Sequence, residues 1–433
     1  MGCRDIYNQE NKIGVYALVD CNNFFVSCER VFQPQLEGKA VVVLSNNDGC
    51  VVARSNESKA LGIKMCTPFY QVRHLVDEGR LYACSSNYAL YGDLSNRVMS
   101  LLADAVPRIE IYSIDEAFLH LEGIAPENVP ELCRNLVEKI RKWVGVPVSI
   151  GVAPTKTLAK IASHFAKKYK GYRGVCMMDT ESKMMKALEL TPIEDVWGIG
   201  RRTAPKLKDR GIMTAYDFTQ MSESTVRHML GITGLKTWNE LRGVPCIEFE
   251  DNFETKQSIC VSRSFSSEIY ALSELQEQIA NFASSLAEKL RKQNTAASEI
   301  AVFAYTNRFK DNAPQMNSNT LVSFITPTAD QRTIVAHCVR AAELLKEGYG
   351  YKKAGVVATK IIRCEEVMHS LFEDTQAIEK EQKLTSALDA INGALGKGTI
   401  KLAVQGSGNI KTANSNQSPH YTTLWSDIPK VIV

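Results

Sequence analysis

The stretch RIEIYSIDEAFLHL, residues 108–121, decides the fold class, because apolar and polar residues alternate on both sides of a short acidic segment. Alternation with a period of two is typical of half-buried strands. We therefore predict a pair of strands with Asp115 and Glu116 at the tip between them. Upstream, GVYALVD at residues 14–20 predicts a buried strand that ends in a third acid, Asp20.

Helices alternate with strands around this pair. The run AVVVL at residues 40–44 predicts a strand, and NESKALG at residues 56–62 predicts a short helix. An amphipathic helix over residues 130–143 is followed by the strand VPVSIGVA and a helix over residues 155–168. This order predicts an α/β-type sheet that helices cover on one side.

The rest of the chain changes character twice. From residue 180 to 245 the pattern is helical with glycine-rich interruptions, and from 255 to 363 strands and helices alternate again. A polar link, a helix and a tail rich in Asn, Ser and Gly follow. Because 433 residues exceed one ordinary hydrophobic core, we expect a multidomain α/β (α+β) protein.

Composition excludes several classes of protein. Hydrophobic residues make up 45% of the chain and charged residues 23%, which is ordinary for a globular protein. No apolar run reaches the roughly 18 residues that span a bilayer, and the first residues lack a signal core, so we expect a cytoplasmic protein without membrane contact. The 12 cysteines are scattered singly, which predicts reduced, buried thiols.

The net charge of +3 is small, but basic residues gather in two places. Residues 156–173 hold six Lys or Arg and no acid, and residues 201–210 hold five against one acid. Such stretches fit local anionic partners. The alternative is solvated helix faces, and charge alone does not choose between them.

The three acids suggest phosphoryl-transfer chemistry. Neighbouring strands lie about 4.8 Å apart, so Asp20, Asp115 and Glu116 can share divalent cations. Two such ions suit phosphoryl transfer, and Mg²⁺ needs few protein carboxylates. The alternative is ordinary turn acids, although adjacent acids between apolar strands repel unless something neutralises them. Two aromatics, Phe24 and Phe25, follow the first acid and are either core residues or a floor that excludes a 2′-hydroxyl.

Several motifs resemble those of the Y family of translesion DNA polymerases. VDCNNFFVSCE is similar to its first polymerase motif, YSIDEAF to its second, and PVSIGVAPTKTLAKIASHFAKK to the stretch that closes the palm. NNDGCVVARSNESKALGIKM, SSNYALYGDLSNRVMS and the terminal YTTLWSDIP resemble the UmuC branch of that family. The resemblance covers nearly the whole chain from about residue 14.

This resemblance implies a right-hand polymerase with palm, small fingers, helical thumb and little finger. The implied divisions are residues 14–32 and 86–178 for the palm, 33–85 for the fingers, 179–250 for the thumb, 255–363 for the little finger, and 364–433 for a clamp-binding linker and tail. It also implies two Mg²⁺ ions, with Asp20, Asp115, Glu116 and the backbone carbonyl of Cys21 as their ligands.

The nucleotide site follows from the same resemblance. Phe25 matches the steric gate that selects the sugar, and Phe24 matches the ring whose backbone cradles the triphosphate. Lys167 matches the palm lysine that reaches the β and γ phosphates. Lys59 stands where most relatives have Arg, and Asn56 where many have Tyr; a Lys lacks the bidentate fork of Arg, so a looser phosphate grip is expected.

The DNA-holding parts are less specific. VWGIGRRTAPKLKDRGI indicates a helix-hairpin-helix, whose alternative is an ordinary helical hairpin. The predicted DNA contacts are Gly198, Gly200, Arg201, Arg202 and Lys206 in this motif, with Lys256 and Arg263 in the little finger. MHSLFED resembles a sliding-clamp motif through Met368, Leu371 and Phe372, with Met368 in place of the usual Gln.

The resemblance therefore implies an error-prone DNA-directed DNA polymerase of the SOS damage response. Its expected partners are primer-template DNA, dNTPs, the sliding clamp, a processed UmuD-type dimer and RecA, at the nucleoid in the cytoplasm. One alternative is a catalytically weak DNA-binding scaffold, which the three acids disfavour. Another is a nucleotide cyclase, which the helix-hairpin-helix and the second DNA-facing domain disfavour.

Overall fold

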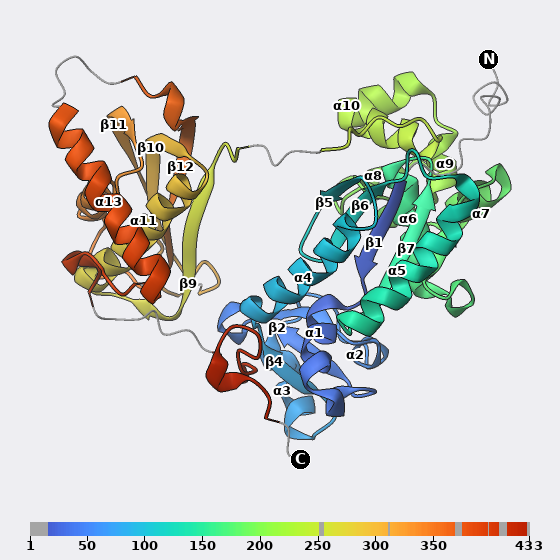
Figure 1. The fold of residues 1–433 in the computed structure, drawn as a ribbon, viewed down its shortest axis with the longest axis horizontal. Coiled ribbons are helices and arrows are strands. Elements are labelled where there is room, and N and C mark those ends of the chain that lie inside the picture. Colours follow the sequence, from blue (N-terminus) through green and yellow to red (C-terminus); the bar gives the residue numbers. More distant parts are fainter. Residues whose placement is uncertain are drawn as a thin grey trace. The chain divides into compact units, whose positions relative to one another are not determined.

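The computed structural model describes residues 16–250, 255–310, 312–368, 375–396, 398–406 and 414–430 (Figure 1). The chain divides into two compact units. One consists of Met1–Asn252 with Ser415–Val433, and the other of Phe253–Asn414. The C-terminal segment therefore belongs to the first unit, although the second unit precedes it in the chain.

A five-stranded sheet is the centre of the first unit. Its order is β5 (Arg108–Ile111), β6 (Glu116–His120), β1 (Tyr16–Cys21), β7 (Val148–Ala153) and β8 (Val175–Met177). β1 is antiparallel to both β6 and β7, and β7 is parallel to β8. The predicted strand pair is therefore present, with its acids at the turn between β5 and β6.

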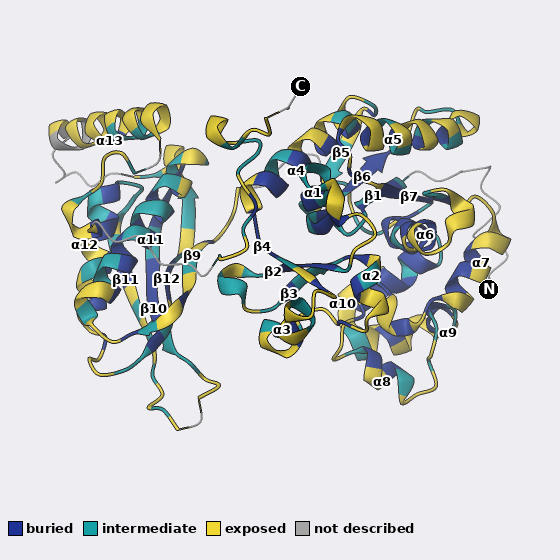
Figure 2. Ribbon diagram, turned by 90° about the horizontal axis from the view of Figure 1, so that it is seen from below, coloured by how far each residue is buried: buried dark blue, intermediate teal, exposed yellow. Residues whose placement is uncertain are grey.

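Helices cover this sheet on both faces, so the expectation of a single covered face was wrong. Ala17 and Val19 pack into a core with α1 (Phe24–Phe32), α4 (Tyr88–Ala103) and α5 (Val129–Trp143). Leu18, on the opposite face, packs with α6 (Lys156–Lys168) and the helices that follow it. Both faces are apolar because β1 and β7 are central strands, and every residue of β7 is buried (Figure 2).

Gly151 shows how closely α6 approaches the sheet. A Cβ atom at this position would lie 2.0 Å from the backbone nitrogen of Ser163 and 2.4 Å from the carbonyl oxygen of Ala159. Only glycine lets the helix backbone come this near to the central strand. The close approach fixes the height of α6 over the strand ends that carry the acids.

A smaller sheet has the order β3 (Val51–Arg54), β2 (Val41–Leu44) and β4 (Tyr82–Ser85). With α2 (Asn56–Ala60) and α3 (Phe69–Asp77) it encloses its own small core. Ser55 caps α2, since its Oγ accepts a hydrogen bond from the Ser58 backbone nitrogen at 3.1 Å. This subdomain corresponds to the predicted fingers.

The helical region predicted after residue 180 consists of α7 (Glu181–Leu190), α8 (Ala204–Lys208), α9 (Ala215–Thr219) and α10 (Glu223–Leu241). No strand lies in this region among the described residues. Leu207, Phe218 and Trp238 belong to the same core as α6, so this region packs against α6.

The second unit is an antiparallel sheet of order β11 (Asn317–Thr328), β10 (Thr295–Thr306), β12 (Tyr351–Arg363) and β9 (Ile259–Ile269). The helices α11 (Leu272–Lys292) and α12 (Gln331–Ala342) share one core with it. The predicted last helix is present as α13 (Thr375–Leu395), which Asp389 ties to Arg291 of α11 at 2.6 Å.

Two expectations from composition can be compared with the fold. In the part of the chain that the structure describes, none of the helices combines the length and the apolar character needed to cross a membrane. The described cysteines are all free thiols, but the expectation that they are buried was wrong for Cys66, Cys260 and Cys364, which are exposed.

Candidate active site

The three predicted acids meet at the ends of two paired strands. Asp20 lies opposite Glu116 in the β1–β6 register, and the Cys21 backbone nitrogen donates to the Asp115 carbonyl oxygen at 2.9 Å. Ser113 shapes the turn that presents them, because its Oγ accepts from the backbone nitrogens of Asp115 at 3.2 Å and Glu116 at 3.0 Å. The corner is thus built by strand pairing and by the turn that Ser113 caps.

Two lysines on one face of α6 neutralise this corner. Lys167 donates from Nζ to Oδ1 of Asp20 at 2.8 Å. Seven residues earlier on the same face, Lys160 Nζ donates to both carboxylate oxygens of Glu116, each at 3.0 Å. Burial raises the pKa of Glu116, and the Lys160 ammonium opposes that rise. The repulsion expected between adjacent acids is therefore offset by cations that lie seven residues apart in the helix.

The donors of this corner fit Mg²⁺, which prefers carboxylate oxygen and takes only one or two carboxylates besides substrate phosphates. Among the described residues, however, no three His, Cys, Asp or Glu side chains already converge as a metal-binding group. Asp115 Oδ1 instead accepts from the Ser113 hydroxyl at 2.5 Å, and lysines hold Asp20 and Glu116. The three acids are positioned by their strands, while their oxygens are engaged by the protein.

A cavity of about 190 Å³ opens beside the corner. It brings together six of the predicted residues: Cys21, Phe24, Phe25, Lys59, Asp115 and Lys167. The remaining lining residues are Asn23, Val52, Ala53, Arg54 and Met65. The larger sheet and the smaller one thus form opposite walls of one pocket, with a carboxylate and three cations at its edge.

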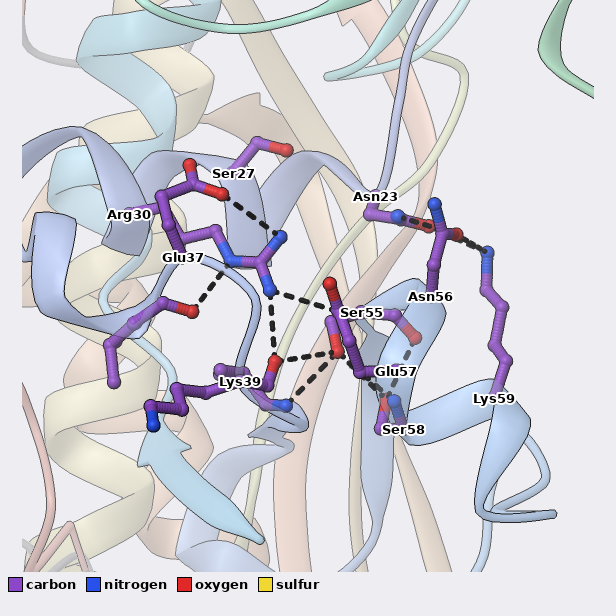
Figure 3. Close-up of polar contacts among 12 residues, drawn as sticks. Asn23, Ser27, Arg30, Glu37, Lys39, Ser55, Asn56, Glu57, Ser58 and Lys59 are labelled. Atoms are coloured by element: carbon purple, nitrogen blue, oxygen red, sulfur yellow. Dashed lines mark hydrogen bonds and ion pairs between the residues drawn. The ribbon is translucent and has the colours of Figure 1, made fainter. Parts of the chain in front are cut away.

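Lys59 does not project freely into this cavity (Figure 3). Its Nζ donates to Oδ1 of Asn23 at 2.6 Å and to Oδ1 of Asn56 at 3.4 Å. Asn23 Nδ2 also donates to Asn56 Oδ1 at 3.1 Å. Partial burial lowers the pKa of Lys59, and the nearby Lys167 lowers it further. The contact joins the loop before α1 to the fingers helix α2.

Arg30 makes a second link between α1 and the fingers (Figure 3). One guanidinium nitrogen, Nη2, donates to the Lys39 carbonyl oxygen and to Glu57 Oε2, each at 2.9 Å. Its Nε donates to the Leu36 carbonyl oxygen at 3.1 Å. The side chain is largely buried, so its planar set of donors is held in one geometry.

The two aromatics of α1 differ in their surroundings. Phe24 is buried in the core, whereas Phe25 is half-buried and lines the cavity. The Phe25 ring stacks on Tyr91, with centroids 4.5 Å apart and an interplanar angle of 14°. Tyr88 contacts it edge-on at 5.9 Å. Phe25 therefore has one face supported by α4 and another toward the pocket.

The predicted helix-hairpin-helix turn has one position that requires glycine. Gly198 has a φ of +91°, and a Cβ atom there would lie 2.7 Å from Thr237 Oγ1. Gly200 has neither constraint, and its carbonyl accepts from the backbone nitrogens of Thr203 and Ala204 at 2.9 and 3.0 Å. The helix that follows, α8, has only five residues. The predicted basic residues Arg201, Arg202 and Lys206 are all exposed.

The remaining predicted contacts lie in the second unit. Lys256 and Arg263 are exposed, and Arg263 is on the edge strand β9. Met368 is 88% exposed, while Leu371 and Phe372 lie outside the described residues. The DNA and clamp contacts thus stay predictions.

Sequence reasoning missed four residues of the site: Asn23, Arg54, Ser113 and Lys160. Lys160 had a usable signal, because it precedes Lys167 by seven residues on the same helix face. Ser113 had one too, since a Ser two residues before paired acids favours a side-chain-capped turn. The roles of Asn23 and Arg54 depend on contacts between distant segments and had none.

The chain is similar to a known protein family over two regions. Residues 19–164 match the impB/mucB/samB family, and residues 256–371 match the C-terminal domain of the same family. Residues 382–431 match a domain of unknown function (DUF4113). Protein UmuC of Salmonella typhimurium is 39% identical, over 96% of this chain and 100% of that protein.

More distant similarities agree with these. DNA polymerase IV of Desulfatibacillum aliphaticivorans is 27% identical, over 89% of this chain and 95% of that protein. A solved Y-family DNA polymerase chimera matches with a TM-score of 0.63 and 23% identity, over 80% of this chain and 99% of its own. An insertion ternary complex of Dbh DNA polymerase matches with a TM-score of 0.56 and 21% identity, over 80% and 99%.

The fold is that of the solved Y-family DNA polymerases, and the acidic corner lies at the strand ends of its central sheet. The chain belongs to the impB/mucB/samB family, which matches residues 19–164 and 256–371, and it is similar to UmuC over 96% of its length. The fold class, the family and the class of enzyme predicted from the sequence are thereby confirmed.

Proposed function

We propose that the chain adds deoxynucleotides to a primer 3′-end opposite damaged template bases, as the error-prone polymerase of an SOS response. The observation that carries this proposal is a shared site. The corner of Asp20, Asp115 and Glu116 adjoins the cavity that Phe25, Lys59 and Lys167 line. A nucleotide in that cavity would have its phosphates beside the acids and its sugar beside the ring.

Asp20, Asp115, Glu116 and the Cys21 carbonyl would hold two Mg²⁺ ions. When bound, these ions promote ionisation of the primer hydroxyl and stabilise negative charge on the phosphates. Ser113 keeps the two acids of the turn in place, and strand pairing keeps Asp20 opposite Glu116. The chain's contribution is a set of carboxylates with little freedom to move.

The lysines of the site are already held near it and would change partners. Lys167 pairs with Asp20, and Lys59 bonds to Asn23 and Asn56. On nucleotide binding, both ammonium groups would exchange these partners for oxygens of the triphosphate. The triphosphate carries more negative charge than the present partners. Phe25 would exclude a ribonucleotide by contact with its 2′-hydroxyl.

DNA and partner binding follow from exposed charge and from family likeness. Arg201, Arg202 and Lys206 would contact the DNA backbone from the thumb, and Lys256 and Arg263 from the little finger, without regard to sequence. Met368, Leu371 and Phe372 would bind the sliding clamp. A UmuD-type dimer and RecA would complete the active complex at the nucleoid.

A catalytically weak scaffold is the second candidate. Primer extension across a template abasic site, with Mg²⁺, dNTPs, clamp, activated RecA and processed UmuD partner, separates the two. We expect bypass by the wild type and by Glu131→Ala, a control at an exposed acid of α5. We expect none from the Asp115→Ala, Glu116→Ala double variant. Equal failure of all three proteins, with DNA binding retained, would support the scaffold.

A further inference from the structure

The C-terminal segment 414–430 packs against the fingers and palm, although 375–406 belong to the second unit. Tyr421 stacks on Phe32 of α1, with ring centroids 4.7 Å apart and an interplanar angle of 9°. Ser418 is buried, at 7% exposure. This segment lies in the domain of unknown function, residues 382–431, so its docking has no assigned role.

The segment begins by adding to a sheet edge. The Ser85 backbone nitrogen donates to the Asn416 carbonyl oxygen at 3.0 Å, and the Asn416 nitrogen donates to Ser85 Oγ at 3.1 Å. Ser85 and Gln417 form a parallel bridge, and Gln417 Nε2 donates to the Ser86 carbonyl oxygen at 3.1 Å. Because β4 is an edge strand of the fingers sheet, the tail satisfies backbone groups that an edge leaves unpaired.

The tail then bonds to the residue that starts α4. Asn87 is fully buried, and its Oδ1 caps the helix by accepting from the Leu90 backbone nitrogen at 3.2 Å. Its Nδ2 lies within donating distance of the Ser418 carbonyl oxygen at 3.1 Å, Ser418 Oγ at 3.0 Å and the Pro419 carbonyl oxygen at 3.2 Å. The tail therefore fixes the side chain that begins the helix carrying Tyr91.

A buried carboxylate of α1 holds Tyr91 on the same helix. Glu29 of α1 has no exposed surface, and it accepts from the Tyr91 hydroxyl at 2.6 Å and from Gln33 Nε2 at 3.2 Å. A buried carboxylate is costly unless its oxygens are satisfied, so each of these donors matters to its position.

Tyr91 is the last link, because its ring supports Phe25. We infer that Ser418 and Tyr421 are positioning residues for Phe25, so that the C-terminal segment takes part in selecting the sugar of the incoming nucleotide. This inference rests on the proposed function, in which Phe25 is the steric gate. The tail reaches the gate through α4: Asn87 Nδ2 donates to Ser418 Oγ, Asn87 caps the helix that carries Tyr91, and the Tyr91 ring stacks on Phe25.

The test compares incorporation of one dNTP and of the matching rNTP by the full chain in its complex with the processed UmuD-type partner. Ser418→Ala and Tyr421→Ala are expected to lower the ratio of the two kcat/KM values about tenfold, since small misplacement of a positioning group costs one to two orders of magnitude. The change should arise from a higher kcat/KM for the rNTP, with kcat/KM for the dNTP and primer-template affinity unchanged. Ser415→Ala, an exposed serine of the same segment, is the matched control and should retain the wild-type ratio.

Two further variants keep the outcome decisive. Tyr421→Phe should behave as wild type, because it keeps the stacked ring, and it remains informative if Ser418→Ala does not fold. In Phe25→Ala the ratio of the kcat/KM values for dNTP and rNTP should fall strongly, and adding Ser418→Ala should lower it no further. An unchanged ratio in active Ser418→Ala and Tyr421→Ala proteins would overturn the inference. An unchanged ratio in Phe25→Ala would instead overturn the proposed gate.

Discussion

Lys160 lies against Glu116 with its ammonium 3.0 Å from both carboxylate oxygens, and the same ammonium stands over the rings of Tyr112 at 4.7 Å and Trp197 at 5.4 Å. Trp197 precedes the glycine turn of the thumb, and its Nε1 donates to the Tyr112 hydroxyl at 3.3 Å. An acid of the proposed metal site and two aromatic residues, one of them beside the glycine turn, thus meet at one half-buried lysine.

Replacement of Lys160 by Met should lower kcat about 10- to 100-fold, because Glu116 loses the partner that fixes its orientation. KM for dNTP should change little, since Lys160 does not line the nucleotide cavity. Single-turnover primer extension measures both quantities. Lys168→Met, an exposed lysine of the same helix, is the control, and equal kinetics for the two variants would refute a positioning role.

Lys59→Met should raise KM for dNTP about tenfold, since the fingers lose a phosphate-binding cation and their bond to Asn23. Lys59→Arg should bind the nucleotide at least as tightly as the wild type, because a guanidinium offers a bidentate grip. Steady-state incorporation at varied dNTP concentration distinguishes these outcomes. Lys64→Met, exposed on the same subdomain, should leave KM unaltered.

Gly198→Ala should destabilise the thumb by roughly 1–3 kcal/mol, because a non-glycine residue is strained at this φ and its Cβ clashes with Thr237 Oγ1. DNA affinity should fall with it. Gly200→Ala meets no atom within 4 Å and has no positive φ, so it should be tolerated. Thermal unfolding and DNA titration of the two variants provide the check, and similar losses in both would argue against the turn geometry.

Glu29 predicts a pH dependence of stability. Burial raises the pKa of the Glu29 carboxyl above 4.5. The contribution of this group to the free energy of unfolding is therefore fully present below the unfolded pKa and is lost as pH rises through the folded pKa. Relative to Glu29→Gln, which does not titrate, the wild type should become less stable as the pH rises above about 4.5. Urea denaturation over this range tests it, and a difference that does not vary with pH contradicts it.

The sequence alone determined which local elements form and which acids stand at their ends. Strand alternation around Asp115 and Glu116, the strand before Asp20 and the helix bearing Lys167 are properties of short segments, and the structure has each of them. The resemblance of the sequence motifs to those of a known family also predicted the family and several residues that line the pocket. These features are readable because periodicity and residue type act within a few residues.

Only the tertiary structure decided which distant side chains meet. Lys167 reaches Asp20 across 147 residues, and Asn87 reaches Ser418 across 331. It also showed that both faces of the palm sheet are covered, since an apolar central strand is compatible with one covering layer or with two. Such contacts depend on how whole elements pack, which no local pattern records. The position of the C-terminal segment beside α4 was therefore visible only in the fold.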